Sequence, residues 1–368
     1  MPSRVPATPA RVRSSFRQKC RDSALAGLYR TGLLNIARHM EGTHELYSIP
    51  GSRFPRLRQF AGSKFGILCY HRVGTEGIPL FSRLAPDLFE KQMRYVRKNY
   101  RVVSLGQLCQ ELQEHRSAQP PTLAVTFDDG YRDLYDHAFS VLQKYRIPAT
   151  IYLIGRCMKT GEAPWYDRIF AAMDAAPVDR LVLELESSRA FDLSYPGARS
   201  QAAWEIVCYL RVLSDKQRRE WCTGFEERMK PPEKPLEACM LNWEQVRAMR
   251  CGGISFGAHT MTHPVVSRLE PQALQEELLE SKQFLEAGLD CAVEDFAYPF
   301  GKPEDAGGFA EDFLENCGYR SAVTTTYGFN TTSTNRFRLN RLQVGESWST
   351  MDFAFNVSRL FFQGRTER

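Results

Sequence analysis

The chain has 368 residues, of which 43% are hydrophobic and 25% are charged, and its formal net charge is +5. A chain of this composition can bury at least one full hydrophobic core, which excludes an intrinsically disordered protein. Beyond the first roughly sixty residues the basic positions are interleaved with acidic ones. The charge pattern therefore gives no sign of a nucleic-acid partner.

The N-terminal region is predicted to be separate from the main domain. Residues 1–22 are rich in Arg, Ser and Pro, which predicts a flexible basic N-terminus. Residues 23–62 carry apolar positions at helical spacing and are predicted to form an amphipathic helical extension. This helix either docks on the main domain or makes a peripheral contact with an anionic membrane surface. Because no spanning segment, signal peptide or CxxC pair is recognisable, we predict a cytoplasmic protein with reduced thiols.

Residues 63–348 alternate strand-like and helix-like runs and are predicted to form one barrel domain. This rhythm is typical of a parallel sheet, and about seven strands with intervening helices favour an incomplete barrel over an open sheet. The predicted strands lie within residues 65–73, 122–129, 149–155, 252–259, 293–301, 319–325 and 338–345. The predicted helices lie within residues 87–100, 105–115, 134–145 and 272–288, and one more ends near Gly318.

Two segments fall outside this alternation. Residues from about 156 to 240 contain long polar helical patterns and the stretch MKPPEKP. They are predicted to form a helical insertion or cap. Residues 349–368 are predicted to form a C-terminal helix.

Two adjacent acids, Asp128 and Asp129, follow the strand-like run that begins at residue 122. Adjacent side chains of an extended segment point to opposite sides, so these two can share a site only where the backbone turns, which Gly130 permits. The C-terminal ends of barrel strands line the mouth of an active site. A pair of Asp residues before glycine is also a common turn, so this motif alone leaves both interpretations open.

Two of the seven histidines, His259 and His263, lie four residues apart directly after another strand-like run. If they lie on one helical turn, both imidazoles face the same way and converge on one ion. Two imidazoles and one carboxylate leave a divalent transition metal with open positions, as in a catalytic site. Together with the paired acids, the histidines favour a metal-dependent hydrolase. Zn²⁺ suits such donors best, and Fe, Co, Ni and Mn also fit.

The motifs together resemble a known family. They are TFDDG at 126–130, HTMTH at 259–263 and FAYPFG at 296–301. Their order and spacing are similar to those of the polysaccharide deacetylase family with the NodB homology domain, carbohydrate esterase family 4. With CYHRV at 69–73, the AYPFG motif resembles the branch that acts on bacterial exopolysaccharides and surface glycans.

The resemblance covers about residues 64–345 and implies a distorted (β/α)7 barrel that hydrolyses an N-acetyl group in a metal-dependent reaction. Carried over by motif position, Asp129, His259 and His263 would hold the metal, and Asp128 would be the general base. A bound dication would lower the pKa of a water and polarise the acetyl carbonyl. The family similarity also implies that a backbone N–H near Tyr131 would help to stabilise the oxyanion.

The chain departs from the family pattern at two positions. Ala297 stands where many members carry an arginine that orients the base, and no histidine follows His263 to act as the usual general acid. His71, in CYHRV, is predicted to be the general acid or a substrate-site histidine, against a purely structural role. Arg341 is predicted to restore a positive charge near Asp128 or to contact the substrate, against an ordinary salt bridge.

Further substrate contacts are predicted from the aromatic residues. Tyr298, Pro299 and Phe300 either shape the pocket wall or pack in the core. Trp165 either stacks on a sugar ring or anchors the insertion to the barrel.

We therefore predict a metal-dependent hydrolase that removes an N-acetyl group from an amino sugar of a polysaccharide or of a surface-glycan precursor. The alternatives are a deformylase or deacylase of a lipid-linked amino sugar and a glycan-binding pseudoenzyme. The intact residues Asp128, Asp129, His259 and His263 argue against the pseudoenzyme, because binding alone needs neither the base nor the full set of metal donors.

Overall fold

The structure is a computed structural model that describes residues 64–75, 83–116, 121–229 and 239–362. The predicted basic N-terminus (1–22) and the predicted amphipathic extension with its membrane contact (23–62) lie outside the described residues. So does the end of the predicted C-terminal helix, whose described part is α14. Among the described residues, no helix is long and apolar enough to cross a membrane.

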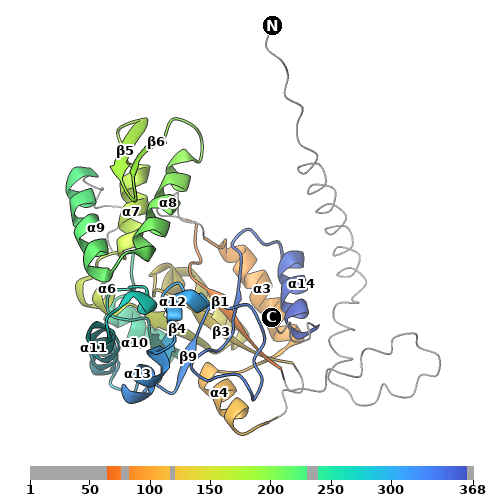
Figure 1. Ribbon diagram of the computed structural model, residues 1–368. Helices are drawn as coiled ribbons and strands as arrows, with labels where there is room; N and C mark the ends of the chain where they lie inside the picture. The colour runs from red at the N-terminus through yellow and green to blue at the C-terminus, as the bar shows by residue number, and fades with distance from the viewer. Residues whose placement is uncertain (1–63, 76–82, 117–120, 230–238, 363–368) are drawn as a thin grey trace, which may run out of the picture.

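One curved parallel sheet forms the centre of the molecule (Figure 1). Its strands follow the spatial order β10-β1-β3-β4-β7-β8-β9, and the short strand β2 pairs with β3. The two strands that precede the predicted site, β1 and β3, are buried along their whole length, as expected when helices cover a parallel sheet. The strands are β1 Phe65–Tyr70, β2 Arg101–Val102, β3 Thr122–Phe127, β4 Ala149–Leu153, β7 Ile254–Ala258, β8 Asp295–Ala297, β9 Ser321–Val323 and β10 Leu342–Gln343.

A single extended segment closes the gap between the two ends of the sheet. Leu342 of β10 pairs in parallel with Leu68 of β1. Three residues earlier, Leu339 forms a parallel bridge with Val323 of β9. Residues 339–343 therefore join the first and last strands, and the predicted distorted (β/α)7 barrel is confirmed.

Helices cover the outside of the barrel, and their predicted positions agree closely with the structure. The predicted helix 272–288 extends over Pro271–Leu289, where proline occupies the first turn and leaves no helical hydrogen bond unmade. The covering elements are α3 Pro86–Asn99, α4 Leu105–Gln113, a π-helical turn Leu134–Ala138, α5 Phe139–Tyr145, α6 Gly155–Thr160, α10 Trp243–Cys251, the short 3-10 turn Val266–Arg268, α11 Pro271–Leu289, α12 Pro303–Ala306, α13 Ala310–Asn316 and α14 Thr350–Phe362.

Between β4 and β7, residues 164–229 stand apart from the barrel in Figure 1 and are called the insertion below. It contains its own hydrophobic cluster, in which Phe170, Ile206 and Leu210 are fully buried. The elements are α7 Trp165–Asp174, β5 Arg180–Glu184, β6 Ser188–Asp192, α8 Ala198–Val212 and α9 Asp215–Met229. The sequence predicted helices alone here, which is wrong, because β5 and β6 form an antiparallel hairpin.

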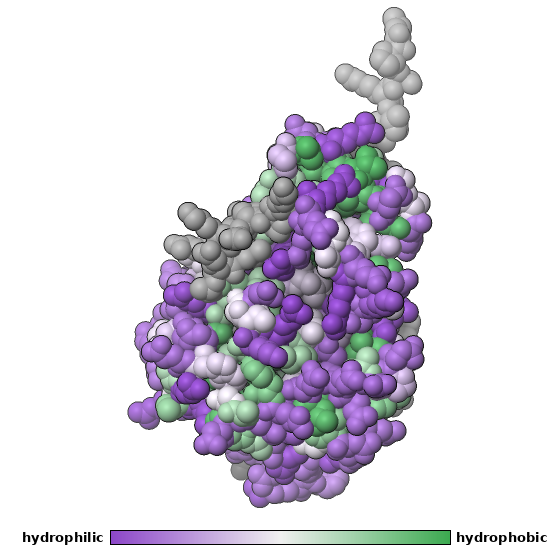
Figure 2. Space-filling view, turned by 90° about the vertical axis from the view of Figure 1, so that its left-hand side faces the viewer, coloured by the Kyte–Doolittle hydropathy of each residue, from purple (hydrophilic) through white to green (hydrophobic). Residues whose placement is uncertain are grey.

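The space-filling view of the side that carries α9 and α11 is predominantly hydrophilic (Figure 2). Several hydrophobic patches lie at the top of this view, in the insertion. The exposed large hydrophobic residues of the insertion include Val182, Tyr195 and Trp204.

Candidate metal and catalytic centre

The two adjacent acids are separated by a sharp turn at the end of β3. Asp128 continues the strand, because its backbone N–H donates to the carbonyl of Tyr70 on β1 at 2.9 Å. Asp129 and Gly130 then adopt positive φ angles of 73° and 81°. Glycine meets this requirement without strain, and a Cβ at residue 130 would lie 2.6 Å from Leu153 Cδ2. Because of this turn, the carboxylates of Asp128 and Asp129 contact two different sets of residues.

Asp129 faces both predicted histidines. Its Oδ1 atom lies 3.5 Å from Nε2 of His259 and 3.5 Å from Nε2 of His263. All three residues are buried, with exposed fractions of 4%, 2% and 4% for Asp129, His259 and His263. One ligand atom from each lies within 4.8 Å of the others, which is a spacing that one ion can bridge.

The two histidines do not converge through a helical turn, and that part of the prediction is wrong. β7 ends at Ala258 and the next residues form a loop in which Thr260 and His263 have φ angles of 62° and 58°. The Thr260 hydroxyl accepts a hydrogen bond from the backbone N–H of His263 at 3.0 Å. Glu277 of α11 accepts hydrogen bonds from the backbone N–H groups of residues 261 and 262 at 2.7 and 2.9 Å. These bonds hold the loop in a conformation that a helix-based argument cannot anticipate.

The donor set fits a divalent transition metal. Nδ1 of His259 lies 2.7 Å from the carbonyl oxygen of Ala297, which can only accept, so this nitrogen carries the proton and Nε2 keeps its lone pair. Burial, followed by the neighbouring His259, lowers the pKa of His263 well below its usual value. The imidazole of His263 is thus held neutral at pH 7, as metal binding requires. Asp129 supplies the anionic oxygen.

Asp128 forms a buried ion pair with Arg341. Nη1 and Nη2 of Arg341 donate to Oδ1 and Oδ2 of Asp128, both at 2.7 Å. Burial alone would raise the pKa of Asp128, but the charge and hydrogen bonds of Arg341 hold it well below its usual range. Arg341 is fully buried, so neither the predicted substrate contact nor a surface salt bridge describes it. It places a positive charge beside Asp128 although Ala297 carries none.

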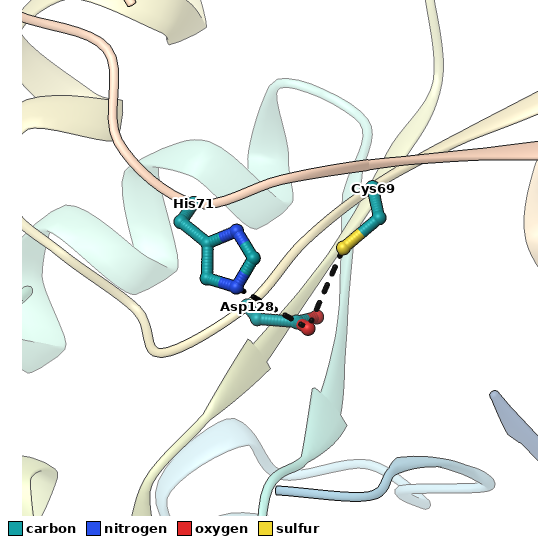
Figure 3. A group of neighbouring side chains, drawn as sticks. All are labelled: Cys69, His71 and Asp128. Carbon is teal, nitrogen blue, oxygen red and sulfur yellow. Dashed lines mark hydrogen bonds and ion pairs between the residues drawn. The ribbon is translucent and has the colours of Figure 1, made fainter. Parts of the chain in front are cut away.

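Cys69, near the end of β1, and His71, just after it, both face the carboxylate of Asp128 (Figure 3). Nε2 of His71 is 4.0 Å from Oδ2 of Asp128, and the Cys69 thiol donates to the same oxygen at 3.6 Å. The side chain of His71 is 24% exposed. Burial raises the pKa of Cys69 well above its usual value, so the thiol stays protonated. A second metal site is disfavoured here because the guanidinium of Arg341 places a positive charge against both oxygens of Asp128.

Trp165 and Arg218 connect the insertion to the metal-binding loop. The indole N–H of Trp165 and Nη1 of Arg218 both donate to the backbone carbonyl of His263, at 3.1 and 3.0 Å. The guanidinium of Arg218 also lies 4.9 Å from the centre of the Trp165 ring. Of the two roles considered for Trp165, these contacts support anchoring of the insertion to the barrel.

The remaining predicted substrate residues fall into two groups. Tyr131 and Tyr298 are fully buried, and the hydroxyl of Tyr131 donates to Asp167 Oδ1 at 3.2 Å. Tyr298 packs against Phe296 in the core with a ring separation of 5.3 Å, and Pro299 is buried beside it. Phe300 is only half-buried, and its ring lies 5.0 Å from that of His263. Among these residues, Phe300 is therefore the one that is both partly exposed and next to a predicted metal ligand.

Three residues of the site were not identified as site residues from the sequence. Cys69 is one of ten scattered cysteines, and Arg218 is one of several charges on a polar helix. Glu277 breaks the pattern more clearly, because it is an acid on the buried side of α11, with an exposed fraction of 7%. A buried acid on an amphipathic helix needs hydrogen-bond donors, and this could have marked it as a structural contact.

Comparisons with known proteins identify the family of the chain and support its fold. YxkH of Bacillus subtilis (strain 168), which is named as a polysaccharide deacetylase, is 23% identical over 302 residues, covering 81% of this chain and 77% of YxkH. The Streptococcus pyogenes deacetylase PplD, solved with acetate, has a TM-score of 0.55 at 20% identity and covers 80% of this chain and 98% of its own.

IcaB from Ammonifex degensii has a TM-score of 0.51 at 20% identity and covers 82% of this chain and 97% of its own. At these identities, the solved structures support the fold. The sequence model of the family described as polysaccharide deacetylase matches residues 115–321, more than half of the 368-residue chain. The chain therefore belongs to the polysaccharide deacetylase family.

Proposed function

We propose that this protein is a metal-dependent hydrolase that removes the N-acetyl group from an amino sugar of a polysaccharide or of a surface-glycan precursor. The observation that carries the proposal is the division of labour between adjacent acids. Asp129 faces His259 and His263, whereas Asp128 is paired with Arg341. The same division supports an enzyme rather than a glycan-binding protein, because binding alone has no need of a second, ionised carboxylate.

In this proposal Asp129, His259 and His263 hold one divalent ion, with Zn²⁺ as the first choice for two nitrogen donors and one oxygen donor. Fe, Co, Ni and Mn fit the same donors. A bound ion supplies polarisation of the amide carbonyl and activation of a water molecule. The protein holds both proposed histidine ligands in place. The Ala297 carbonyl fixes the ring of His259, and Trp165 and Arg218 fix the backbone of His263.

Asp128 is proposed as the general base. Its ion pair with Arg341 keeps it ionised at neutral pH and fixes the plane of its carboxylate. Each carboxylate oxygen has two lone pairs, so the bonds from Arg341 leave capacity to accept a proton from the attacking water. The low pKa makes Asp128 a weak base by itself, and its contribution therefore depends on prior activation of that water.

His71 is proposed as the general acid that protonates the leaving sugar amine. Its Nε2 lies 4.0 Å from Oδ2 of Asp128, the proposed base, and its side chain keeps 24% of its surface exposed, where a bound substrate can reach it. The backbone N–H of Tyr131, at the turn after Asp129, is proposed to donate to the oxyanion. The acetate in the PplD structure is the acid that such a reaction releases, which supports the choice of the acetyl group.

Acetate release tests the proposal directly. Metal-loaded wild-type protein, Asp128→Asn and His71→Gln are incubated with N-acetylglucosamine oligomers and with a lipid-linked N-acetylated amino sugar. We expect acetate from wild type and a loss of about 100-fold or more in kcat for each variant, with bound metal measured to be unchanged. Release of formate or a longer acid would favour the alternative deformylase or deacylase. No release of any acid from a folded, metal-loaded protein would refute the proposal.

A further inference from the structure

The two proposed histidine ligands differ in what surrounds their second ring nitrogen. Nδ1 of His259 lies 2.7 Å from the carbonyl oxygen of Ala297, which fixes that ring. Nδ1 of His263 is buried and, among the described residues, has no hydrogen-bond partner. A metal-binding histidine usually donates from its second nitrogen to an acceptor, which sets the orientation of the ring. Other contacts therefore have to orient the ring of His263.

Aromatic packing surrounds the ring of His263. The ring of Tyr166 lies 4.9 Å from it with an angle of 59° between the planes, and the ring of Phe300 lies 5.0 Å from it at 70°. The ring of His259 is a third neighbour, at 4.8 Å and 73°. Tilted and edge-to-face pairs at these separations are favourable and depend on orientation. This packing can set the plane of an imidazole that no hydrogen bond fixes.

Phe300 lies in an uncommon backbone turn after β8. Its φ angle is 60°, a value that few residues other than glycine adopt. The Thr325 hydroxyl donates to the carbonyl of Phe300 at 2.8 Å, and the N–H of Thr325 donates to the carbonyl of Gly301 at 2.7 Å. Residues in such conformations cluster at functional sites. The barrel thus holds the backbone of Phe300, and contacts to the side chain decide where its ring lies.

The insertion supplies contacts to the ring of Phe300, which packs against the hydrophobic cluster of the insertion. The guanidinium of Arg211, on α8, lies 4.3 Å from the centre of this ring. Nη2 of Arg211 donates to both oxygens of Asp305, at 3.0 and 2.7 Å. Asp305 belongs to the barrel and also accepts from the backbone N–H of Lys302, at the start of α12. The pair is mostly buried, with side-chain exposed fractions of 19% and 7%, so it holds Arg211 over the ring.

We propose that Arg211 is a positioning residue of the metal site, because it holds the ring of Phe300 in place and thereby fixes the orientation of the His263 imidazole. Trp165 and Arg218 hold the backbone of the same histidine by hydrogen bonds, whereas Arg211 holds its ring by packing. The inference rests on the metal site of the proposed function and assigns the insertion a second contact with it.

Cobalt binding to the full-length, metal-free protein tests this role. Arg211→Met keeps an unbranched side chain and removes the charge, and Phe300→Leu removes the ring. Both should lower the affinity for Co²⁺ about 10-fold and change the visible absorption of the bound ion, which depends on the arrangement of its ligands. Arg320→Met is the matched control, because Arg320 also pairs with a carboxylate, that of Glu294, but both side chains are exposed. It should leave affinity and absorption unchanged.

A double variant separates a positioning role from a general effect on folding. Because Arg211 is proposed to act through Phe300, Arg211→Met/Phe300→Leu should bind Co²⁺ about as tightly as Phe300→Leu alone. Losses that add up in the double variant, or unchanged affinity and absorption in both single variants, would overturn the inference. Urea unfolding checks that each metal-free variant is folded. If Arg211→Met is not, Asp305→Asn takes its place, because it removes the ion pair and keeps the size of the side chain.

Acetate release separates this inference from the proposed function. If wild type releases acetate and both single variants bind Co²⁺ as wild type does, the inference fails and the function stands. If wild type releases no acid, but the single variants lose Co²⁺ affinity and the double variant loses no more, the positioning role stands and the proposed function is refuted.

Discussion

Replacing Arg341 by methionine should destabilise the folded protein strongly, because it leaves Asp128 as a buried, uncompensated charge. Arg341 is fully buried and Asp128 is 2% exposed, so water cannot take the place of the lost guanidinium. Breaking a buried ion pair by removing one partner costs about 3–5 kcal/mol. The Cys69 thiol is the other donor to this carboxylate, at 3.6 Å, and it is too weak to compensate.

The loss should depend on pH with a definite sign. In wild type the folded-state pKa of Asp128 is depressed, so the pair stabilises the protein above the ordinary carboxyl pKa and loses this effect only in strong acid. In Arg341→Met, burial becomes the dominant influence and raises the pKa of Asp128 above its unfolded value. The folded variant then binds a proton more tightly than the unfolded chain, so its stability falls as pH rises from about 4 to 8.

Urea unfolding of the metal-free proteins at pH 5 and pH 8 provides the assay, with Arg341→Met/Asp128→Asn as the second variant. The single variant should lose about 3–5 kcal/mol at pH 8 and less at pH 5. The double variant should recover a large part of that loss, because it carries no buried charge at either position. A single variant within about 1 kcal/mol of wild type at pH 8, or a double variant no more stable than the single one, would show that the pair does not act as described.

Three further predictions concern the metal-binding loop and the turn after β3. Arg218→Met removes one of the two donors to the His263 carbonyl, so the affinity for Co²⁺, followed by its visible absorption, should fall about 10-fold to 100-fold; unchanged affinity would show that Arg218 does not help to position His263. Gly130→Ala should lower the free energy of unfolding, measured in urea, by about 1–3 kcal/mol, since the residue has a φ of 81° and its Cβ would lie 2.6 Å from Leu153 Cδ2; an unchanged free energy would show that the turn can relax. Chelation should abolish acetate release and Zn²⁺ should restore it, and full activity in the chelated protein would exclude a role for the ion.

The barrel could be predicted from the sequence because its signals are local. The buried strands β1 and β3 are continuous apolar runs, and α11 begins at a proline and repeats apolar residues at helical spacing. The hairpin formed by β5 and β6 was missed because its local signal is weak. Its strands are short and half-exposed, so their local pattern does not distinguish them from the polar helices around them.

The candidate site could be predicted only in part, since motifs identify residues but not their surroundings. His259 and His263 were chosen by their spacing and Asp129 by its motif position in the family resemblance, and the structure brings all three together. The expected helical turn between His259 and His263 was nevertheless wrong. The two histidines converge because of positive φ angles at Thr260 and His263 and because of hydrogen bonds to Thr260 and Glu277. Likewise, the choice between pocket wall and core for Tyr298 depends on packing that the sequence does not encode locally.

The position of Arg341 shows why a missing motif residue does not imply a missing function. The cation beside Asp128 comes from Arg341 rather than from the residue at position 297. β10 and β3 are the two neighbours of β1, and Leu342 pairs with Leu68, so Arg341 lies next to the middle of β1. Its long side chain reaches Asp128 at the end of β3. Cys69 lies on β1 and touches the same carboxylate. Arg341 thus reaches Asp128 from the start of a strand that lies two places away in the sheet, and the strand order brings together residues that are 213 positions apart in the sequence.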